Sequence, residues 1–372
     1  MTSTGFTWRT ESDAPAPTSL NAVGDALTAD EALKRVRRGE VLLYEGDFHN
    51  ARQLMGAMGR RLEKSKPVAK SALDAFRIER RSRAIEHETL GRIVVKLDPS
   101  YRLSLKRAPD VRVACEQAWG SAGGKDTVVA FKTLLGVLGA AEWRKKGLEV
   151  PGLKKPLAPH YGVYAPTRTE YVELVRALGH VEGAKVFDIG TGTGVLGLVL
   201  LAKGAASVVA TDVDSRAVAC ARDNAQRFGV AKQMVVEERE LFPEGKADLV
   251  VCNPPWVPEA PKTRVDRAVF DEGGAMLEAF LSGVRAHLTP KGRAVLIISN
   301  LAELLGLRAP GFLDDAFARH GLSVLRTHTA KAKHGKAKDV EDPLHAARSK
   351  EVTTIYELVS LSSRGGEGRG EE

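Results

Sequence analysis

Four consecutive residues, Asn253-Pro254-Pro255-Trp256, have the side chains and carbonyls that could bind a planar NH2 group and make its nitrogen reactive. Asn253 offers a side-chain carbonyl acceptor, and Pro254 offers a backbone carbonyl beside it. The prolines hold φ near −65° and lack an N–H, so they stiffen the turn. Two neighbouring acceptors can bind both N–H bonds of a planar amine or amide. We expect them to favour a pyramidal nitrogen, to align it for in-line transfer and to stabilise its developing positive charge.

Trp256 is expected to stack on the planar group and to favour cationic character there. This chemistry requires no metal and no strong base. His334 and His345 have no metal-ligand partners at suitable spacing, and His160 is expected to pack or form hydrogen bonds. The alternative interpretation of the Asn-Pro-Pro-Trp sequence is an ordinary proline-rich strand end.

A second chemical feature lies earlier in the chain, where Phe187-Asp188-Ile189 runs into the glycine-rich sequence 190–194. The glycines allow a tight strand-to-helix turn and a close approach of the backbone to a ligand. Asp212 ends the next apolar run, 18 residues after Gly194. A carboxylate there can accept both hydroxyl protons of a ribose, as acids do at about this spacing in dinucleotide folds. The pattern therefore predicts a nucleotide-like cofactor.

The glycine sequence leaves the cofactor open, because 192–197 also matches the GxGxxG pattern of nicotinamide and flavin dehydrogenases. Asp188 argues against that interpretation, since a carboxylate at the strand end would repel a pyrophosphate. The same carboxylate suits the cationic methionine part of S-adenosylmethionine. Asp212 and the Asn-Pro-Pro-Trp sequence then follow at positions typical of methyltransferases. A glycine-rich turn without any ligand is the third interpretation.

These residues must be positioned by a parallel sheet. Apolar, β-rich runs alternate with helical segments, as in sheets that are buried on both faces. Two further runs could close the sheet. The expected strands are 185–189, 207–211, 234–237, 248–252, 293–299, 323–328 and 352–358. Asn253 would then lie at the carboxyl edge, where open α/β sheets bind ligands.

Together these motifs resemble the class I S-adenosylmethionine-dependent methyltransferases, in the branch with an Asn-Pro-Pro-aromatic motif. That branch includes release-factor glutamine N5-, adenine N6- and ribosomal-RNA guanine N2-methyltransferases. The resemblance covers about residues 160 to 361. It implies a Rossmann-like seven-stranded α/β sheet, S-adenosylmethionine as cofactor and methyl transfer to nitrogen.

The resemblance also assigns roles at matching positions. Glu240 corresponds to the acid that meets the adenine amine, with Glu237 and Glu238 as nearby alternatives, and 164–170 resembles the segment that helps to cover the cofactor. Trp256 stands where the protein and RNA enzymes usually have Tyr or Phe. The expected cofactor-binding residues are Tyr164, Asp188, Gly190, Thr191, Gly192, Thr193, Gly194, Asp212, Val213, Glu240, Leu241 and Asn253, and the expected catalytic residues are Asn253, Pro254, Pro255 and Trp256.

A different composition precedes this region. We expect a flexible leader over 1–20, a mostly helical N-terminal domain over 21–150, the methyltransferase domain over 151–362 and a disordered tail over 363–372. The division rests on the breaker-rich joint at 151–159. Within the N-terminal domain, Thr28-Ala-Asp-Glu31 matches a capping box before a helix. Further helices are expected at 50–65, 71–88, 109–119 and 126–147, and a strand at 92–97.

The overall composition is that of a globular protein, with 372 residues, 43% hydrophobic and 27% charged. No apolar window is long enough for a membrane span, and no secretory signal is visible. Three scattered cysteines predict neither a disulfide framework nor a zinc site. We therefore expect a reduced, cytoplasmic protein, and no feature indicates its oligomeric state.

The charge distribution bears on the substrate. Residues 60–112 hold 15 Lys/Arg against 7 Asp/Glu, and 331–338 form a second basic segment. Either could contact RNA, and either could be a solvated surface. The leading hypothesis is N-methylation in the translation apparatus, with a ribosomal- or transfer-RNA base ahead of a glutamine in a ribosomal or other translation protein. The alternatives are a small-molecule N-methyltransferase with 1–150 as a lid, and a catalytically silent RNA-binding protein.

Overall fold

The computed structural model describes residues 5–11, 14–64, 67–262, 265–333 and 335–361. The chain divides into two compact units, of which the first ends at Trp143 and the second starts at Arg144. The joint predicted at 151–159 instead belongs to the second unit, where Leu148 and Leu157 exchange backbone hydrogen bonds of 2.7 and 2.9 Å. Leu157 and Ala158 are fully buried, so this proline-rich segment is packed and does not act as a linker. The predicted tail, 363–372, lies outside the described residues.

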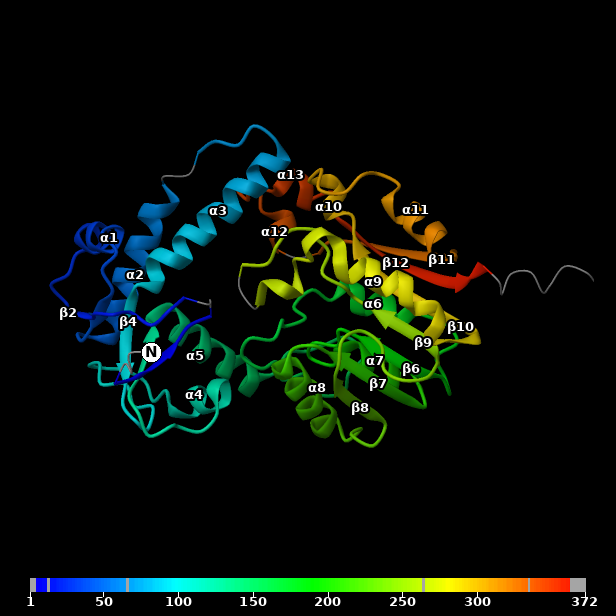
Figure 1. Cartoon of the computed structure of the whole chain (residues 1–372), viewed down its shortest axis with the longest axis horizontal. Coiled ribbons are helices and arrows are strands. Elements are labelled where there is room, and N and C mark those ends of the chain that lie inside the picture. Colours follow the sequence, from blue (N-terminus) through cyan, green and yellow to red (C-terminus); the bar gives the residue numbers. More distant parts are fainter. Residues whose placement is uncertain (1–4, 12–13, 65–66, 263–264, 334, 362–372) are drawn as a thin grey trace, which may run out of the picture. The chain divides into compact units, whose positions relative to one another are not determined.

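The first unit combines helices with a sheet (Figure 1). Thr28 caps the first helix, because its side chain accepts a hydrogen bond of 3.3 Å from the backbone N–H of Glu31. The helices are α1 (Ala29–Arg37), α2 (Phe48–Glu63), α3 (Ala72–Gly91), α4 (Arg112–Trp119) and α5 (Phe131–Lys146), the last of which ends just inside the second unit.

The first unit also has a five-stranded sheet, of which the sequence predicted one strand. The sheet has the order β1-β5-β4-β3-β2. Residues 127–130, predicted as the start of a helix, form β5, because this β-branched run is buried between β1 and β4. Residues 7–9, assigned to the leader, form β1. The strands are β1 (Thr7–Arg9), β2 (Asn21–Val23), β3 (Leu42–Tyr44), β4 (Ile93–Leu97) and β5 (Thr127–Ala130).

The second unit contains the seven-stranded α/β sheet, and all seven predicted strands are confirmed. The order is β11-β12-β10-β9-β6-β7-β8. Strand β12 runs antiparallel to β10 and β11, and the other neighbouring pairs are parallel. The strands are β6 (Lys185–Ile189), β7 (Ser207–Asp212), β8 (Met234–Glu238), β9 (Ala247–Cys252), β10 (Leu288–Ser299), β11 (Leu322–Lys331) and β12 (Val352–Ser360).

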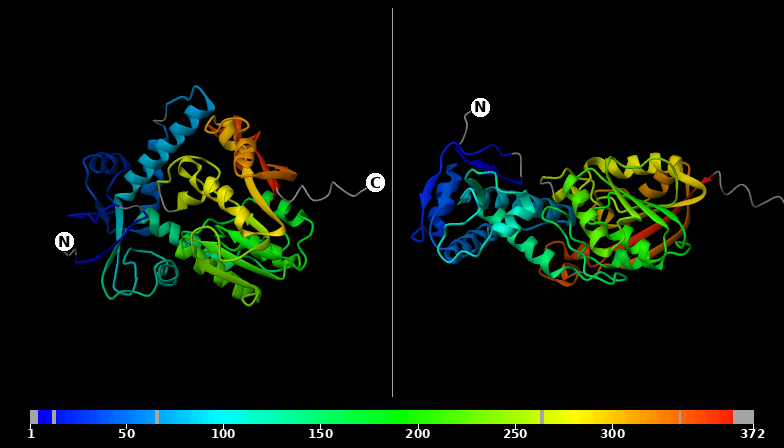
Figure 2. Two further views of the ribbon diagram at one scale, coloured as in Figure 1. Left: turned by 45° about the vertical axis from the view of Figure 1, so that its right-hand side comes forward. Right: turned by 90° about the horizontal axis from the view of Figure 1, so that it is seen from below.

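Helices cover both faces of this sheet (Figure 2). Helices α6 (Glu170–Ala177), α7 (Val195–Ala202) and α8 (Ser215–Phe228) pack with alternate strand residues such as Val186 and Val251. Helices α9 (Ala275–Gly283) and α11 (Phe312–Arg319) pack with the intervening residues, such as Phe187 and Val250. The short helices are α10 (Leu301–Leu304), α12 (Gly335–Lys338), α13 (His345–Arg348), η1 (Val265–Ala268), η2 (Glu272–Gly274) and η3 (Val284–His287). No helix among the described residues is both long and apolar enough to cross a membrane.

The topology brings the two chemical motifs together. From β6 the chain proceeds to β7 and β8, and it then returns to place β9 on the other side of β6. Ile189 is opposite Cys252 in this pair of parallel strands, so Gly190 and Asn253 both follow the same point of the sheet edge. Ligands of doubly wound sheets bind where the strand order reverses in this way.

Candidate active site

The glycine turn after β6 has the conformation that only glycine adopts readily. Gly190, Gly192 and Gly194 have φ values of 69°, 56° and 82°. A Cβ at Gly194 would lie 3.1 Å from Met234 Cε and 3.3 Å from Ala221 Cα, whereas a Cβ at Gly192 would meet no atom within 4 Å. Gly194 therefore allows the turn to pack on the unit, and Gly192 borders open space.

Asp188 lies beneath the turn and is 1% exposed. Its Oδ2 accepts hydrogen bonds from Thr191 Oγ1 (2.6 Å) and from the Gly197 N–H (3.1 Å). Its Oδ1 is buried and has no hydrogen-bond partner within the described part of the chain. Burial raises the pKa of Asp188 to about 6, and nearby Asp212 adds to the rise. A buried acceptor without a partner calls for a cationic or donating ligand.

Asp212, at the end of β7, is also tied to the turn. Its Oδ2 accepts a hydrogen bond of 2.9 Å from the Gly192 N–H, and its Oδ1 accepts one of 3.0 Å from the Asp214 N–H. Burial raises the pKa of Asp212. Each oxygen keeps a further lone pair, so the carboxylate can still accept ribose hydroxyl protons.

The residues of this turn fit S-adenosylmethionine. The unpartnered Oδ1 of Asp188 can accept from a methionine ammonium group, and Asp212 can bind the ribose hydroxyls. The open space at Gly192 allows the cofactor to approach the backbone. A dinucleotide would instead bring a pyrophosphate towards the Asp188 carboxylate, which disfavours the dehydrogenase alternative.

The residues expected around the adenine lie at the same sheet edge, since Asp212 and Glu238 are opposite each other in β7 and β8. Of the three candidate acids, Glu237 forms an ion pair of 3.2 Å with Arg239, whereas Glu238 and Glu240 are exposed. Leu241 has a φ of 53°, and its carbonyl accepts a hydrogen bond from Thr211. Val213 and Tyr164 are 63% and 41% exposed. Their roles in cofactor binding stay predictions.

The Asn-Pro-Pro-Trp sequence follows β9 directly. Asn253 and Trp256 are half-buried, and Asn253 Oδ1 accepts a hydrogen bond of 2.9 Å from Trp256 Nε1. The guanidinium carbon of Arg168 lies 4.8 Å from the centroid of the Trp256 ring. The ring thus contacts a side chain of the protein itself, and its stacking on a substrate stays a prediction.

Arg168 is fixed by two glutamates that are each 1% exposed. Its Nε donates to Glu170 (2.6 Å), and its Nη1 donates to Glu351 (2.9 Å), which also accepts from Ser299 Oγ (2.7 Å). Burial disfavours the charge of Arg168, but Glu351 and Glu170 outweigh that effect, so the pKa of Arg168 is raised. The segment 164–170, which resembles the cover of the cofactor, is thus joined through Arg168 to Glu351, the residue that precedes β12.

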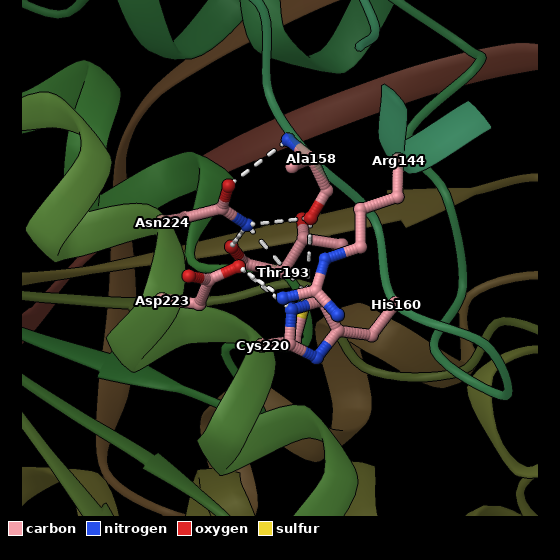
Figure 3. Close-up of polar contacts among 7 residues, drawn as sticks. All are labelled: Arg144, Ala158, His160, Thr193, Cys220, Asp223 and Asn224. Carbon is pink, nitrogen blue, oxygen red and sulfur yellow. Dashed lines mark hydrogen bonds and ion pairs between the residues drawn. The ribbon is translucent and has the colours of Figure 1, made fainter. Parts of the chain in front are cut away.

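Asn224 was missed by the sequence analysis. It is fully buried on α8, and its Oδ1 accepts from the Ala158 N–H (2.9 Å). Its Nδ2 donates to the carbonyls of Ala158 (3.2 Å) and Thr193 (3.0 Å), as Figure 3 shows. One side chain therefore ties Ala158 to the glycine turn. An asparagine inside an amphipathic helix carries no motif that would have revealed this role, and the same holds for Glu351.

Comparisons with known proteins agree with this arrangement. Residues 171–254 match the family model for ribosomal protein L11 methyltransferase. The chain is 33% identical to a release factor glutamine methyltransferase of Cereibacter sphaeroides over 44% of this chain and 66% of that one. It is 30% identical to a protein of Methanocaldococcus jannaschii that is named as a protein N5-glutamine methyltransferase, over 41% of this chain and 80% of that one. It is 35% identical to the ribosomal RNA small subunit methyltransferase C of Chromohalobacter salexigens, over 48% of this chain and 49% of that one.

The matches take in 41% to 48% of this chain, and they span about half to four-fifths of the length of these relatives. The residues that the family model matches include the glycine turn and the strand that ends at Asp212. The chain belongs to the class I S-adenosylmethionine-dependent methyltransferases, in the branch with an Asn-Pro-Pro-aromatic motif.

Proposed function

We propose that the protein transfers a methyl group from S-adenosylmethionine to a planar nitrogen, either an exocyclic base amine or a side-chain amide. The observation that supports this most is the shared edge of β6 and β9, where the glycine turn and Asn253 follow opposed residues. When bound, S-adenosylmethionine supplies an electrophilic methyl group on a positively charged sulfur. Asn253 Oδ1 and the Pro254 carbonyl are the acceptors for the two N–H bonds of the substrate.

These acceptors act by position and charge. A planar nitrogen is a weak nucleophile because its lone pair is delocalised, and two acceptors favour its pyramidal form. As the new N–C bond forms and the S–C bond breaks, positive charge develops on the nitrogen, and the acceptors stabilise it. The nitrogen then loses one proton to water. Pro254 and Pro255 keep the acceptors in place by restricting the turn.

For the substrate we propose the translation apparatus, with an RNA base ahead of a glutamine in protein. The relatives named above support this, since their names refer to a release factor and to ribosomal RNA. The second basic segment supports an RNA: β11 ends at Lys331, opposite Val352, on the same sheet edge as Asn253. Lys331 and Lys333 are exposed there, and Lys333 also pairs with Glu173 at 3.2 Å.

A small-molecule substrate is the second candidate, and the charges of the first unit favour it. Many cations of the basic segment 60–112 have acidic partners within the same unit. The pairs are Arg61–Asp30, Arg83–Glu79, Arg92–Glu88, Lys96–Asp126, Arg107–Asp47 and Arg112–Asp110. This pairing is typical of a solvated surface and leaves less charge for a polyanion.

The test is incorporation of labelled methyl into an extract of cells that lack the gene. The product is divided by RNase digestion, protease digestion and size filtration. We expect RNase to release the label. Release by protease alone would indicate a protein amide, and label that passes the filter would indicate a small molecule. Cofactor binding without transfer to any fraction would contradict the proposal and favour a catalytically silent RNA-binding protein. The three buried, unpaired cysteines support a place of action in the reducing cytoplasm.

A further inference from the structure

The side-chain amide of Asn253 has an accepting end and a donating end, and only one of them suits the proposed reaction. If the group turned by 180°, Nδ2 would take the place of Oδ1 and would present N–H bonds to the N–H bonds of the substrate. In the structure Trp256 Nε1 donates to Oδ1 across 2.9 Å. Because an indole N–H can only donate, this contact favours the orientation in which the oxygen lies on the Trp256 side.

Trp256 is itself held from two directions. Arg168 lies over its ring at 4.8 Å, and Arg308 Nη2 donates to its backbone carbonyl across 3.2 Å. Arg168 cannot easily move away, since two buried glutamates, Glu170 and Glu351, bind different nitrogens of its guanidinium. The ring also packs against the apolar clusters on both faces of the sheet. The donor is therefore preorganised.

We infer that Trp256 is a positioning residue that selects the accepting orientation of Asn253, with Arg168 holding the indole in place. The inference rests on the proposed methyl transfer. One lone pair of Asn253 Oδ1 accepts from Trp256, and the other remains for the substrate N–H. It also gives a reason for Trp at the position where a Phe would supply a ring without an N–H.

The test compares Trp256→Phe in two backgrounds. Phe keeps an aromatic ring for Arg168 and removes the N–H donor together with part of the volume of the indole, a loss of volume that is the same in both backgrounds. In the wild-type background we expect transfer to the gene-deletion extract, at saturating S-adenosylmethionine, to slow by about 10- to 100-fold because Asn253 is misoriented. Asn253→Asp provides an acceptor in both orientations of the side chain. In that background the same Phe substitution should therefore slow transfer by less than about threefold.

Two controls separate orientation from folding. Trp143→Phe changes an exposed tryptophan, which is 46% accessible, and is expected to leave the rate unchanged. Binding of S-adenosylmethionine by Trp256→Phe should stay within about threefold of wild type, because no residue of the glycine turn at 190–194 is altered. The indole N–H resonance of Trp256 in an amide-edited NMR spectrum should move upfield in Asn253→Ala, independently of turnover.

The outcomes are distinct. Equal slowing by Trp256→Phe in both backgrounds would overturn the inference, as would an unchanged indole resonance or an Asn253→Asp variant without measurable transfer. No transfer by the wild-type protein, together with the expected NMR shift, would instead overturn the proposed function, and the positioning role would fall with it. The result that supports the role is a slower methyl transfer by Trp256→Phe in the wild-type background but not in the Asn253→Asp background, with binding of S-adenosylmethionine retained.

Discussion

At the scale of single residues, Asp188 couples the stability of the second unit to cofactor binding. Its folded-state pKa of about 6 is above the usual value of 3.8, so the folded protein holds a proton that the unfolded chain releases. The stabilising contribution of this group is fully present below pH 3.8 and is lost as the pH rises through about 6. A difference of two pH units corresponds to roughly 3 kcal/mol in the free protein.

We predict that Asp188→Asn will gain stability relative to wild type as the pH rises, since Asn cannot ionise. The melting temperature of the variant minus that of wild type should be several degrees more positive at pH 8 than at pH 5, measured without cofactor. An equal difference at both pH values would show that Asp188 does not carry the charge that its burial makes costly.

The same residue predicts a pH dependence of binding. Calorimetry should show the affinity of wild type for S-adenosylmethionine falling below about pH 6, because protonated Asp188 loses its attraction for the ammonium group. Asp188→Asn should bind weakly at every pH and without this dependence. A variant with wild-type affinity at pH 8 would contradict the assignment.

At the scale of elements, substitutions at two glycines can distinguish the effect of a residue on stability from its effect on cofactor binding. Gly192 and Gly39 both have positive φ, and a Cβ would meet nothing within 4 Å at either position. Gly192→Ala and Gly39→Ala should therefore each cost about 1 kcal/mol in backbone strain. Only Gly192→Ala should weaken binding of S-adenosylmethionine, by about tenfold or more, because only its methyl group enters the cofactor space. Equal effects on binding would contradict this.

The contacts of Asn224 predict a second effect at this scale. Asn224→Ala leaves the Thr193 carbonyl without its buried donor and the Ala158 N–H without its buried acceptor, which should cost about 2 to 4 kcal/mol in the free energy of unfolding. Hydrogen exchange of the Ala158 amide should rise, and affinity for S-adenosylmethionine should fall. Asn21→Ala, which removes one half-buried bond in the first unit, is the control. Unchanged exchange at Ala158 would refute the connection.

At the scale of the whole molecule, the charges decide between an RNA and a small substrate. Arg77 and Arg81 are exposed on α3, and Lys331 and Lys333 are exposed at the end of β11. If RNA binds the edge near Asn253, Lys331→Glu with Lys333→Glu should weaken RNA binding. The salt dependence of the affinity should also fall, because fewer phosphate contacts form and fewer counterions are released from the RNA on binding. Arg77→Glu with Arg81→Glu is the charge-matched comparison. Salt-independent binding in wild type would favour a small molecule.

The same scale shows how far sequence reasoning reaches. Five strands of the second unit were predicted because each is an apolar, β-rich run, and the last two were predicted as further β-like runs that could close the sheet. The motifs at the sheet edge follow from residue type and spacing. The strands β1, β2 and β3 escaped because three residues cannot show a period of two, and their pairing depends on distant partners. Asn224 and Glu351 escaped for a related reason: their importance comes from tertiary contacts that no local pattern records.

The measurement that tests the central claim most directly compares wild type with Asn253→Ala in cofactor binding and in methyl transfer. If Asn253 is the substrate acceptor, the variant should bind S-adenosylmethionine within about threefold of wild type. Its transfer of labelled methyl to the gene-deletion extract should slow by about 10² to 10³-fold, as when an enzyme loses one stabilising hydrogen-bond partner. Transfer at the wild-type rate would contradict the account.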